Sequence, residues 1–210
     1  MSARPASGGG RWVDVDPSRL ARWLENFATR HGAYTTDGLT VTAADGAVAT
    51  FEAPPGAADV PDLTDLLLTA AAPRTLGLLL ARKGAVAVGV AAGTELIVSK
   101  VDTHYVQGRT AAGGWSQQRF ARRRANQAKA ATADGAGIAG RVLLPRVRDL
   151  DALIAGGDRS AADAILAARD LAPLAALRAE RFLDVPEPRH AVLVSAIAAA
   201  RAVRVLVKDP

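Results

Sequence analysis

The stretch RTLGLLLARKG (residues 74–84), followed by AVAVGVAAG (85–93) and TELIVSKVDTHYV (94–106), decides the fold. Gly84 and Gly93 mark tight turns between three apolar runs, so the pattern predicts an antiparallel meander of three strands. The runs are almost continuously apolar rather than alternating, which is typical of strands that are covered on both faces.

Helices and further strands alternate after the meander. The expected elements are a loop at 107–114, a basic helix from about Ser116 to Thr132, a second helix from Asp134 or Gly135 to Leu150, a strand at 151–159, a helix at 160–170 with Ser160 as its cap, a short strand within 180–188, a helix at 187–202 and a strand at 203–208. Strands that come first and then alternate with helices predict an α/β fold, with a mixed sheet flanked by helices.

The residues before the meander predict a smaller extension. A helix is expected at 16–32, with Asp16 as its cap, Gly32 at its end and an apolar face made by Leu20, Trp23, Leu24 and Phe27. Two strands joined by a turn at 44–46 should fill 33–54, and a short helix should follow at 62–72. The predicted organisation is therefore a disordered N-terminus at 1–11, a helix and hairpin extension at 12–73, and the main domain at 74–210.

Composition narrows the class of protein. Hydrophobic residues make up 50% of the 210 residues but aromatic residues only 4%, so Ala, Val and Leu must build the core. The chain has no cysteine, which excludes a disulfide framework and thiolate chemistry. The longest apolar run, at 191–200, is about half the length that a bilayer requires, and the N-terminus lacks the apolar core of a signal peptide. These features predict a cytoplasmic protein.

Positive charge is concentrated in one segment. No acidic residue lies between Asp102 and Asp134, whereas the net charge of the whole chain is +5. The interval contains six cations, Arg109, Arg119, Arg122, Arg123, Arg124 and Lys129. Such a local basic patch favours a partner that carries phosphate groups.

The basic helix places its cations on two faces. Arg119, Arg122, Arg123 and Asn126 share one face by their i, i+3 and i+4 spacing, and Phe120, Arg124 and Gln127 share another. Like charges at these spacings repel one another, and no acidic residue nearby offsets the repulsion. The pattern indicates contact with RNA phosphates, with a simple solvated face as the alternative.

A glycine pair and two glutamines precede the cations. Gly113 and Gly114 allow backbone conformations that other residues rarely adopt, although a plain loop before a capped helix would look the same. Trp115, at the tip of this loop, is placed to stack on a base. Gln117 and Gln118 cannot act as general bases, but an amide can hold a water molecule by donating and accepting hydrogen bonds.

The segment GGWSQQRFARRRANQAK (113–129) resembles the signature of the actinobacterial release-factor-like peptidyl-tRNA hydrolases. These proteins are related to the eukaryotic tRNA-releasing factor of ribosome quality control and to the Gly-Gly-Gln domain of eukaryotic and archaeal class I release factors. The segments 100–114 and 151–159 fit as well, so the resemblance extends from about Leu76 to the C-terminus. It implies an RNase H-like α/β fold at 74–210 and metal-independent, cofactor-free hydrolysis of the peptidyl-tRNA ester in the large ribosomal subunit.

The resemblance also implies roles for individual residues. Gly113 and Gly114 would form a mobile loop, and one glutamine would position the attacking water. In release factors the glutamine follows Gly-Gly directly, whereas here Trp115 and Ser116 intervene; Gln117 is favoured over Gln118 but both stay open. The RNA-binding set, in contact with tRNA or rRNA, would be Arg109, Trp115, Arg119, Arg122, Arg123, Arg124 and Lys129. A monomer that acts without a stop codon is expected.

Two other classes of function compete with this interpretation. The basic helix at 116–132 also suits a non-catalytic module that binds RNA or the ribosome. A metal-dependent nuclease would need clustered carboxylates, for which Asp102, Asp151 and Asp158 are candidates at strand boundaries. His31, His104 and His190 are scattered without metal-ligand spacing, so structural roles are expected for them.

Overall fold

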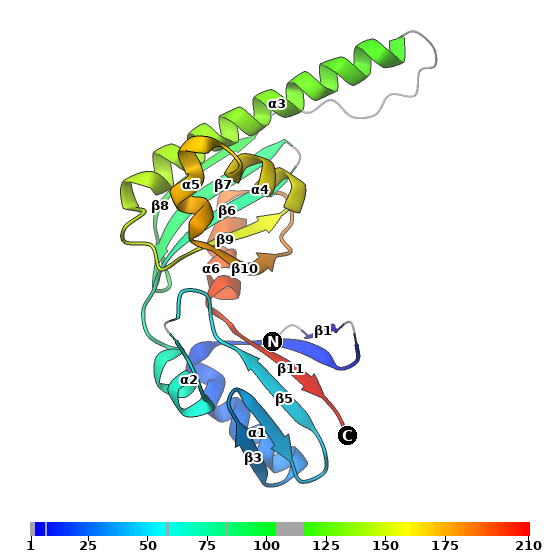
Figure 1. The fold of residues 1–210 in the computed structure, drawn as a ribbon, viewed down its shortest axis with the longest axis vertical. Coiled ribbons are helices and arrows are strands. Elements are labelled where there is room, and N and C mark those ends of the chain that lie inside the picture. The colour runs from blue at the N-terminus through cyan, green and yellow to red at the C-terminus, as the bar shows by residue number, and fades with distance from the viewer. Residues whose placement is uncertain (1–2, 7, 58, 83, 104–115) are drawn as a thin grey trace. The chain divides into compact units, whose positions relative to one another are not determined.

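The computed structural model describes residues 3–6, 8–57, 59–82, 84–103 and 116–210. The chain divides into two compact units (Figure 1). The smaller unit comprises residues 1–74 and 198–210, and the larger unit comprises residues 75–197.

A five-stranded mixed sheet forms the centre of the larger unit. Its strands are β6 (Thr75–Arg82), β7 (Ala85–Ala92), β8 (Glu95–Thr103), β9 (Ala152–Gly157) and β10 (Arg178–Leu183). The spatial order is β10-β9-β6-β7-β8; β6, β7 and β8 pair antiparallel, whereas β9 runs parallel to β6 and β10 parallel to β9. The predicted meander is confirmed, and so is the mixed sheet of the predicted α/β fold.

Helices cover both faces of this sheet, as the apolar runs predict. They are α3 (Ser116–Leu143), α4 (Arg159–Leu166), α5 (Ala172–Ala176) and α6 (His190–Arg201), with 3-10 turns at Leu144–Arg146 and Arg169–Leu171. Val86, Val88 and Val90 point to one face, in the same core cluster as α3 and α4. Gly89 points to the other face, where the position of its absent Cβ lies 2.9 Å from Leu193 of α6. Figure 1 shows α4 and α5 in front of the sheet.

Two expectations about residues 116–170 are wrong. A break was expected near Asp134 and Gly135, but one helix runs through both residues. Gly135 lies inside the helix, where the absence of a side chain leaves room for the side chains of Ile165 and Val86. The cap of the next helix also differs, since Asp158 rather than Ser160 occupies the N-cap of α4.

The smaller unit holds a six-stranded antiparallel sheet and two helices. Its elements are β1 (Ala3–Pro5), β2 (Arg11–Val15), a 3-10 turn (Pro17–Arg19), α1 (Leu20–His31), β3 (Tyr34–Asp37), β4 (Thr40–Ala43), β5 (Val48–Glu52), α2 (Leu63–Thr69) and β11 (Val203–Lys208). The strand order is β1-β2-β11-β5-β4-β3. Leu20, Leu24 and Phe27 pack one face of α1 into the core, as predicted.

Three details of this unit differ from the sequence-based expectations. Residues 3–5, expected to be disordered, form β1 and pair with β2. Residues 33–54 form three strands rather than two, because Gly38, at a φ of 53°, permits an additional turn between β3 and β4. β11 lies between β2 and β5 instead of belonging to a domain at 74–210, since Val203, Val205 and Val207 complete the core of the smaller unit.

Candidate functional site

Helix α3 changes character along its length. Its 28 residues span roughly 42 Å at the rise of an α-helix. The C-terminal part is anchored, because Ile138, Ala139 and Leu143 are buried in the core of the larger unit. Farther towards the N-terminus, Arg122, Asn126 and Lys129 are exposed. The helix therefore exposes cations on its N-terminal part, while its C-terminal part is packed in the core.

The structure describes the sequence-predicted site residues to different extents. Arg122 and Lys129 are exposed on α3, as contact with phosphate requires. Other predicted residues belong to the α3 backbone, but their side chains lie outside the described part; these are Gln117, Gln118, Arg119, Arg123 and Arg124. The remaining predicted residues, Arg109, Gly113, Gly114 and Trp115, lie outside the described residues altogether.

Both glutamines occupy the first turn of α3. The helix begins at Ser116, so Gln117 and Gln118 are its second and third residues. The first backbone N–H groups of an α-helix have no partner within the helix, and the helix dipole makes this end positive. The start of α3 thus carries two glutamines beside backbone N–H groups that can donate hydrogen bonds to an anion.

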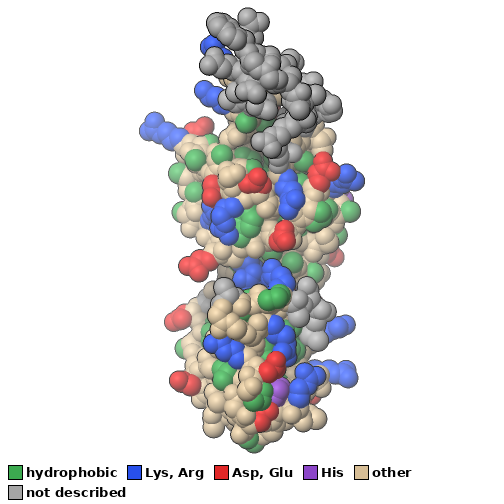
Figure 2. Space-filling model, turned by 90° about the vertical axis from the view of Figure 1, so that its right-hand side faces the viewer, with side chains coloured by type: hydrophobic (Ala, Val, Ile, Leu, Met, Phe, Trp, Pro, Cys, Tyr) green, Lys and Arg blue, Asp and Glu red, His purple; other side chains and the backbone are tan. Residues whose placement is uncertain are grey.

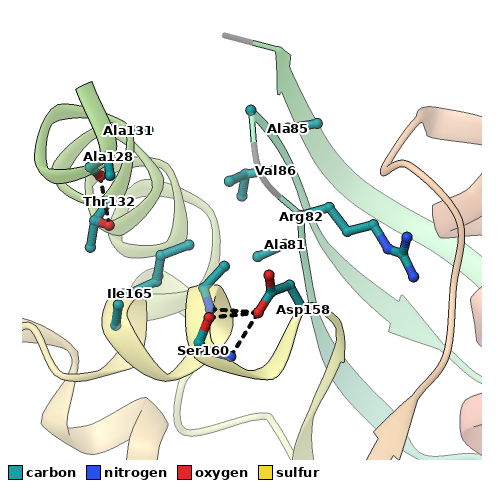
Figure 3. Close-up of a pocket in the computed structure, with 13 residues that line it drawn as sticks. Ala81, Arg82, Ala85, Val86, Ala128, Ala131, Thr132, Asp158, Ser160 and Ile165 are labelled. Atoms are coloured by element: carbon teal, nitrogen blue, oxygen red, sulfur yellow. Dashed lines mark hydrogen bonds between the residues drawn. The ribbon is translucent and has the colours of Figure 1, made fainter. Parts of the chain in front are cut away.

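A hollow of about 350 Å³ lies where α3 passes the turn between β6 and β7 and the start of α4 (Figure 3). Its lining is mostly apolar, and its charged lining residues, Arg82 and Asp158, already have partners. Asp158 accepts hydrogen bonds from the Ser160 Oγ at 2.7 Å and the Ser160 and Ala161 N–H groups at 2.9 and 3.3 Å. Arg82 extends away from α3 and contacts Asp184 at 3.5 Å.

The pKa of the Asp158 carboxyl lies below its usual value, first because the Ser160 hydroxyl donates to it and second because the Ala161 N–H does. Asp158 therefore remains ionised as the cap of α4. A carboxylate held in this way has a structural function, and the hollow beside it offers no general acid or base of its own among the described residues.

The carboxylates considered for a metal-dependent nuclease do not converge. Asp151 and Asp158 lie at opposite ends of β9, and Asp151 accepts a hydrogen bond from the Thr75 N–H at 2.7 Å. Within the described part of the chain, no group of three His, Cys, Asp or Glu side chains could hold a metal ion. His31 is buried with its Nδ1 2.8 Å from an Asp45 oxygen, His190 begins α6, and His104 lies outside the described residues.

A second set of exposed cations lies in the smaller unit and was not predicted from the sequence. Figure 2 shows Lys and Arg side chains at several places on the described surface, so positive charge is not confined to α3. Arg19, Arg22 and Arg30, on the 3-10 turn and on α1, are exposed. The sequence feature that indicates them is the recurrence of arginine at intervals of three and eight residues, beside the apolar face of the same helix.

Comparison with known proteins gives one family match and several similar solved structures. A family model described as the Actinobacteria/chloroflexi VLRF1 release factor matches residues 74–206. No curated protein matches. Among solved structures, an archaeal protein is 17% identical with a TM-score of 0.43, and the match covers 68% of this chain and 41% of that one. The archaeal translation termination factor aRF1 is 14% identical with a TM-score of 0.47, over 90% of this chain and 66% of that one.

This chain spans 41% of the length of the first of these solved chains and 66% of the length of the second. Within the described residues of this chain, no helix has both the length and the apolar character needed to cross a bilayer.

Proposed function

Because this chain belongs to the Actinobacteria/chloroflexi VLRF1 release factor family, we propose that it hydrolyses peptidyl-tRNA and so frees nascent chains from stalled ribosomal complexes. Membership of a release factor family gives it a role in translation and implies interaction with the ribosome. The finer proposal concerns the reaction, the substrate and the residues that carry it out.

The observation that carries the proposal is the position of the two glutamines on α3. They lie in the first turn of a helix whose later turns expose Arg122 and Lys129 and whose end is buried in the core. Cations along the stem would bind tRNA or rRNA phosphates, and this binding would deliver the start of the helix to the ester. Arg109, Trp115, Arg119, Arg123 and Arg124 belong to the same proposed contact with RNA.

The proposed chemistry is attack by water on the carbonyl carbon of the ester. One glutamine accepts a hydrogen bond from the water and fixes its direction, while Gly113 and Gly114 let the chain approach the ester closely. The oxyanion that forms is stabilised by N–H donors, and the N–H groups at the start of α3 are candidates. The bond to the tRNA oxygen then breaks, and that oxygen takes up the proton that the attacking water gives up, with the neighbouring 2′-hydroxyl as the proposed relay. The products are a free peptide acid and tRNA.

The helix register does not choose between the glutamines. Position 118 shares a stripe of α3 with Arg122 and Lys129, which follow after four and eleven residues. Position 117 shares another stripe with Arg124, which follows after seven residues. Each glutamine is therefore aligned with at least one cation, and experiment must assign the catalytic role.

The test measures peptide release from stalled large-subunit complexes that carry labelled peptidyl-tRNA. Wild type is compared with Gln117→Ala, Gln118→Ala and the matched control Gln127→Ala, in which a glutamine farther along α3 is truncated. Loss of the amide that positions water should slow single-turnover release by about 100-fold or more, as for loss of one pre-positioned transition-state donor, with binding retained. EDTA, with controls for ribosome integrity, should leave the rate unchanged. Equal rates for all four proteins would refute the assignment.

The exposed cations on α3 also support a second candidate, a non-catalytic module that binds the ribosome through residues 116–132. It predicts tight binding without release by wild type. It further predicts that Arg122→Glu with Arg123→Glu abolishes function while the glutamine variants behave as wild type. The same release assay, run beside a binding assay, separates the two candidates.

A further inference from the structure

A groove runs along α1 in the smaller unit, beside strand β2. Two hollows of about 560 and 360 Å³ make up this groove, and they adjoin at Trp23 and Asn26, which line both of them. Val13 and Val15 of β2 line the floor, one in each hollow. The groove thus follows the length of α1 rather than forming a compact pocket.

The α1 side of the groove carries a stripe of polar and cationic residues. Arg19, Arg22, Asn26 and Arg30 follow one another at intervals of three or four residues and all line the groove. All four are exposed. At the rise of an α-helix, the Cα atoms of Arg22 and Arg30 are roughly 12 Å apart along the axis. We call Arg19, Arg22, Asn26 and Arg30 the α1 stripe.

Most of the charge of the stripe is not neutralised by the described residues. Arg22 and Arg30 have no ion pair with a described carboxylate. Asp16 at one end of the groove accepts hydrogen bonds from Ser18 and attracts both Arg19 and Arg201. At the other end, Arg11 is paired with Asp209.

Two further ionisable side chains lie in or beside the groove. His31 lines it, but its Nδ1 lies 2.8 Å from an Asp45 carboxylate oxygen. Glu25 occupies the neighbouring side of α1 and does not line the groove. Arg19 and Arg22 are three residues apart, a spacing at which like charges repel, and Arg30 adds a third cation farther along the groove. The lining of the groove therefore carries an excess of positive charge, which suits an anionic partner.

The stripe is extended, which suits an extended anion. A nucleic-acid strand presents phosphates at regular intervals, so one strand can contact cations at both ends of the groove. Trp23 adds a half-buried indole between the two hollows, fixed by stacking on Phe27 at 5.5 Å and by an edge contact with Phe51 at 5.6 Å. Arg and Asn side chains are suited to phosphate and sugar contacts without selection for sequence.

We infer that the groove along α1 binds an RNA backbone, as a second RNA-contacting surface that is independent of α3. The inference deepens the proposed function, on which it rests for the identity of the RNA: a strand of rRNA or tRNA in the complex from which the peptide is released. The α1 stripe contributes affinity and takes no part in the chemical step.

The test uses the full chain with Arg22→Gln and Arg30→Gln combined. The matched control is Arg146→Gln with Arg148→Gln, which removes the same charge from two exposed arginines just after α3. Dissociation constants are measured for the large-subunit complex, for purified large-subunit rRNA and for purified tRNA at several salt concentrations. Each lost phosphate contact lowers the slope of log affinity against log salt by roughly 0.7–0.9, so the groove variant should lose roughly 1.5 and bind about tenfold more weakly at moderate salt. A third protein with Arg22→Lys and Arg30→Lys should recover the slope.

The outcomes separate the groove from the proposed function. An unchanged slope in the groove variant, or an equal loss in the control, would overturn the inference. Weaker binding to the intact complex with unchanged binding to both naked rRNA and naked tRNA would assign the groove to an acidic protein surface, and would overturn the inference too. Release by saturating groove variant should keep the wild-type rate. A chain that binds RNA through the groove but releases no peptide would refute the hydrolase alone.

Discussion

Replacing Gly135 by alanine should show how tightly α3 is seated on the larger unit. A glycine inside a helix is less favourable than alanine by about 1 kcal/mol, so the substitution alone should stabilise the protein. A Cβ at position 135, however, would lie 2.8 Å from Ile165 Cδ1 and 3.3 Å from Val86 Cγ2. Ile165 is 2% exposed and packed in the core, and overpacking of this kind costs about 1–3 kcal/mol. The net effect is a destabilisation of about 0–2 kcal/mol.

Gly140, five residues along the same helix, provides the matched control. A Cβ there would lie 3.6 Å from Leu171 Cδ2 and 3.7 Å from Leu144 Cδ1, which are ordinary contacts. Gly140→Ala should therefore stabilise the protein by about 1 kcal/mol. The two variants should differ by about 1–3 kcal/mol, which corresponds to a separation of about 4–12 °C in the melting temperature of the larger unit.

Calorimetric melting of the full-length variants measures this separation, and the release assay shows its consequence. Gly135→Ala should also reduce peptide release more than Gly140→Ala, because the position of the exposed cations of α3 depends on how the helix packs on the larger unit. If Gly135→Ala melts at the same temperature as Gly140→Ala or higher, the close approach of α3 to Ile165 does not determine stability and the reasoning is refuted.

Three further predictions concern local features. Gly157→Ala should destabilise the larger unit by at least about 3 kcal/mol in urea denaturation, because Gly157 has a φ of 94° and a Cβ would overlap the Ala81 carbonyl oxygen. Asp158→Asn should lower the melting temperature near neutral pH. The pKa of Asp158 is lower in the folded protein than in the unfolded chain, so its carboxylate contributes fully to stability above the unfolded pKa of about 3.8 and loses that contribution at lower pH. The difference in melting temperature from wild type should therefore disappear as the pH falls below about 3.8. Arg74→Met should destabilise the smaller unit by about 1.5–3 kcal/mol in thermal melts, because the buried guanidinium donates to the Thr69 and Ala70 carbonyls at 3.1 and 2.7 Å.

Local patterns in the sequence predicted the elements that depend on near neighbours. The meander followed from Gly84 and Gly93, and the apolar face of α1 followed from the spacing of Leu20, Leu24 and Phe27. The basic character of α3 was evident too, and two of its cations, Arg122 and Lys129, are exposed.

Features that depend on distant contacts were not predictable in this way. A glycine inside a helical pattern is compatible with either a break or a close packing contact, and only the presence of Ile165 opposite Gly135 decides between them. The strand at 203–208 was predicted as a strand, but its neighbours, β2 and β5, lie more than 150 residues away along the chain. The alternation of Val203, Val205 and Val207 fits the core of either unit.

The position of β11 also has a consequence for the order of folding during synthesis. All strands of the larger sheet lie within one continuous segment, residues 75–197, so they can pair as soon as this segment has left the ribosome. The smaller sheet is different, because β11 fills the gap between β2 and β5. Until residues 203–208 emerge, the edges of β2 and β5 stay open and the apolar face of α1 lacks part of its cover. A nascent chain interrupted before β11 would thus carry a complete larger unit and an unfinished N-terminal one, a natural target for proteolysis.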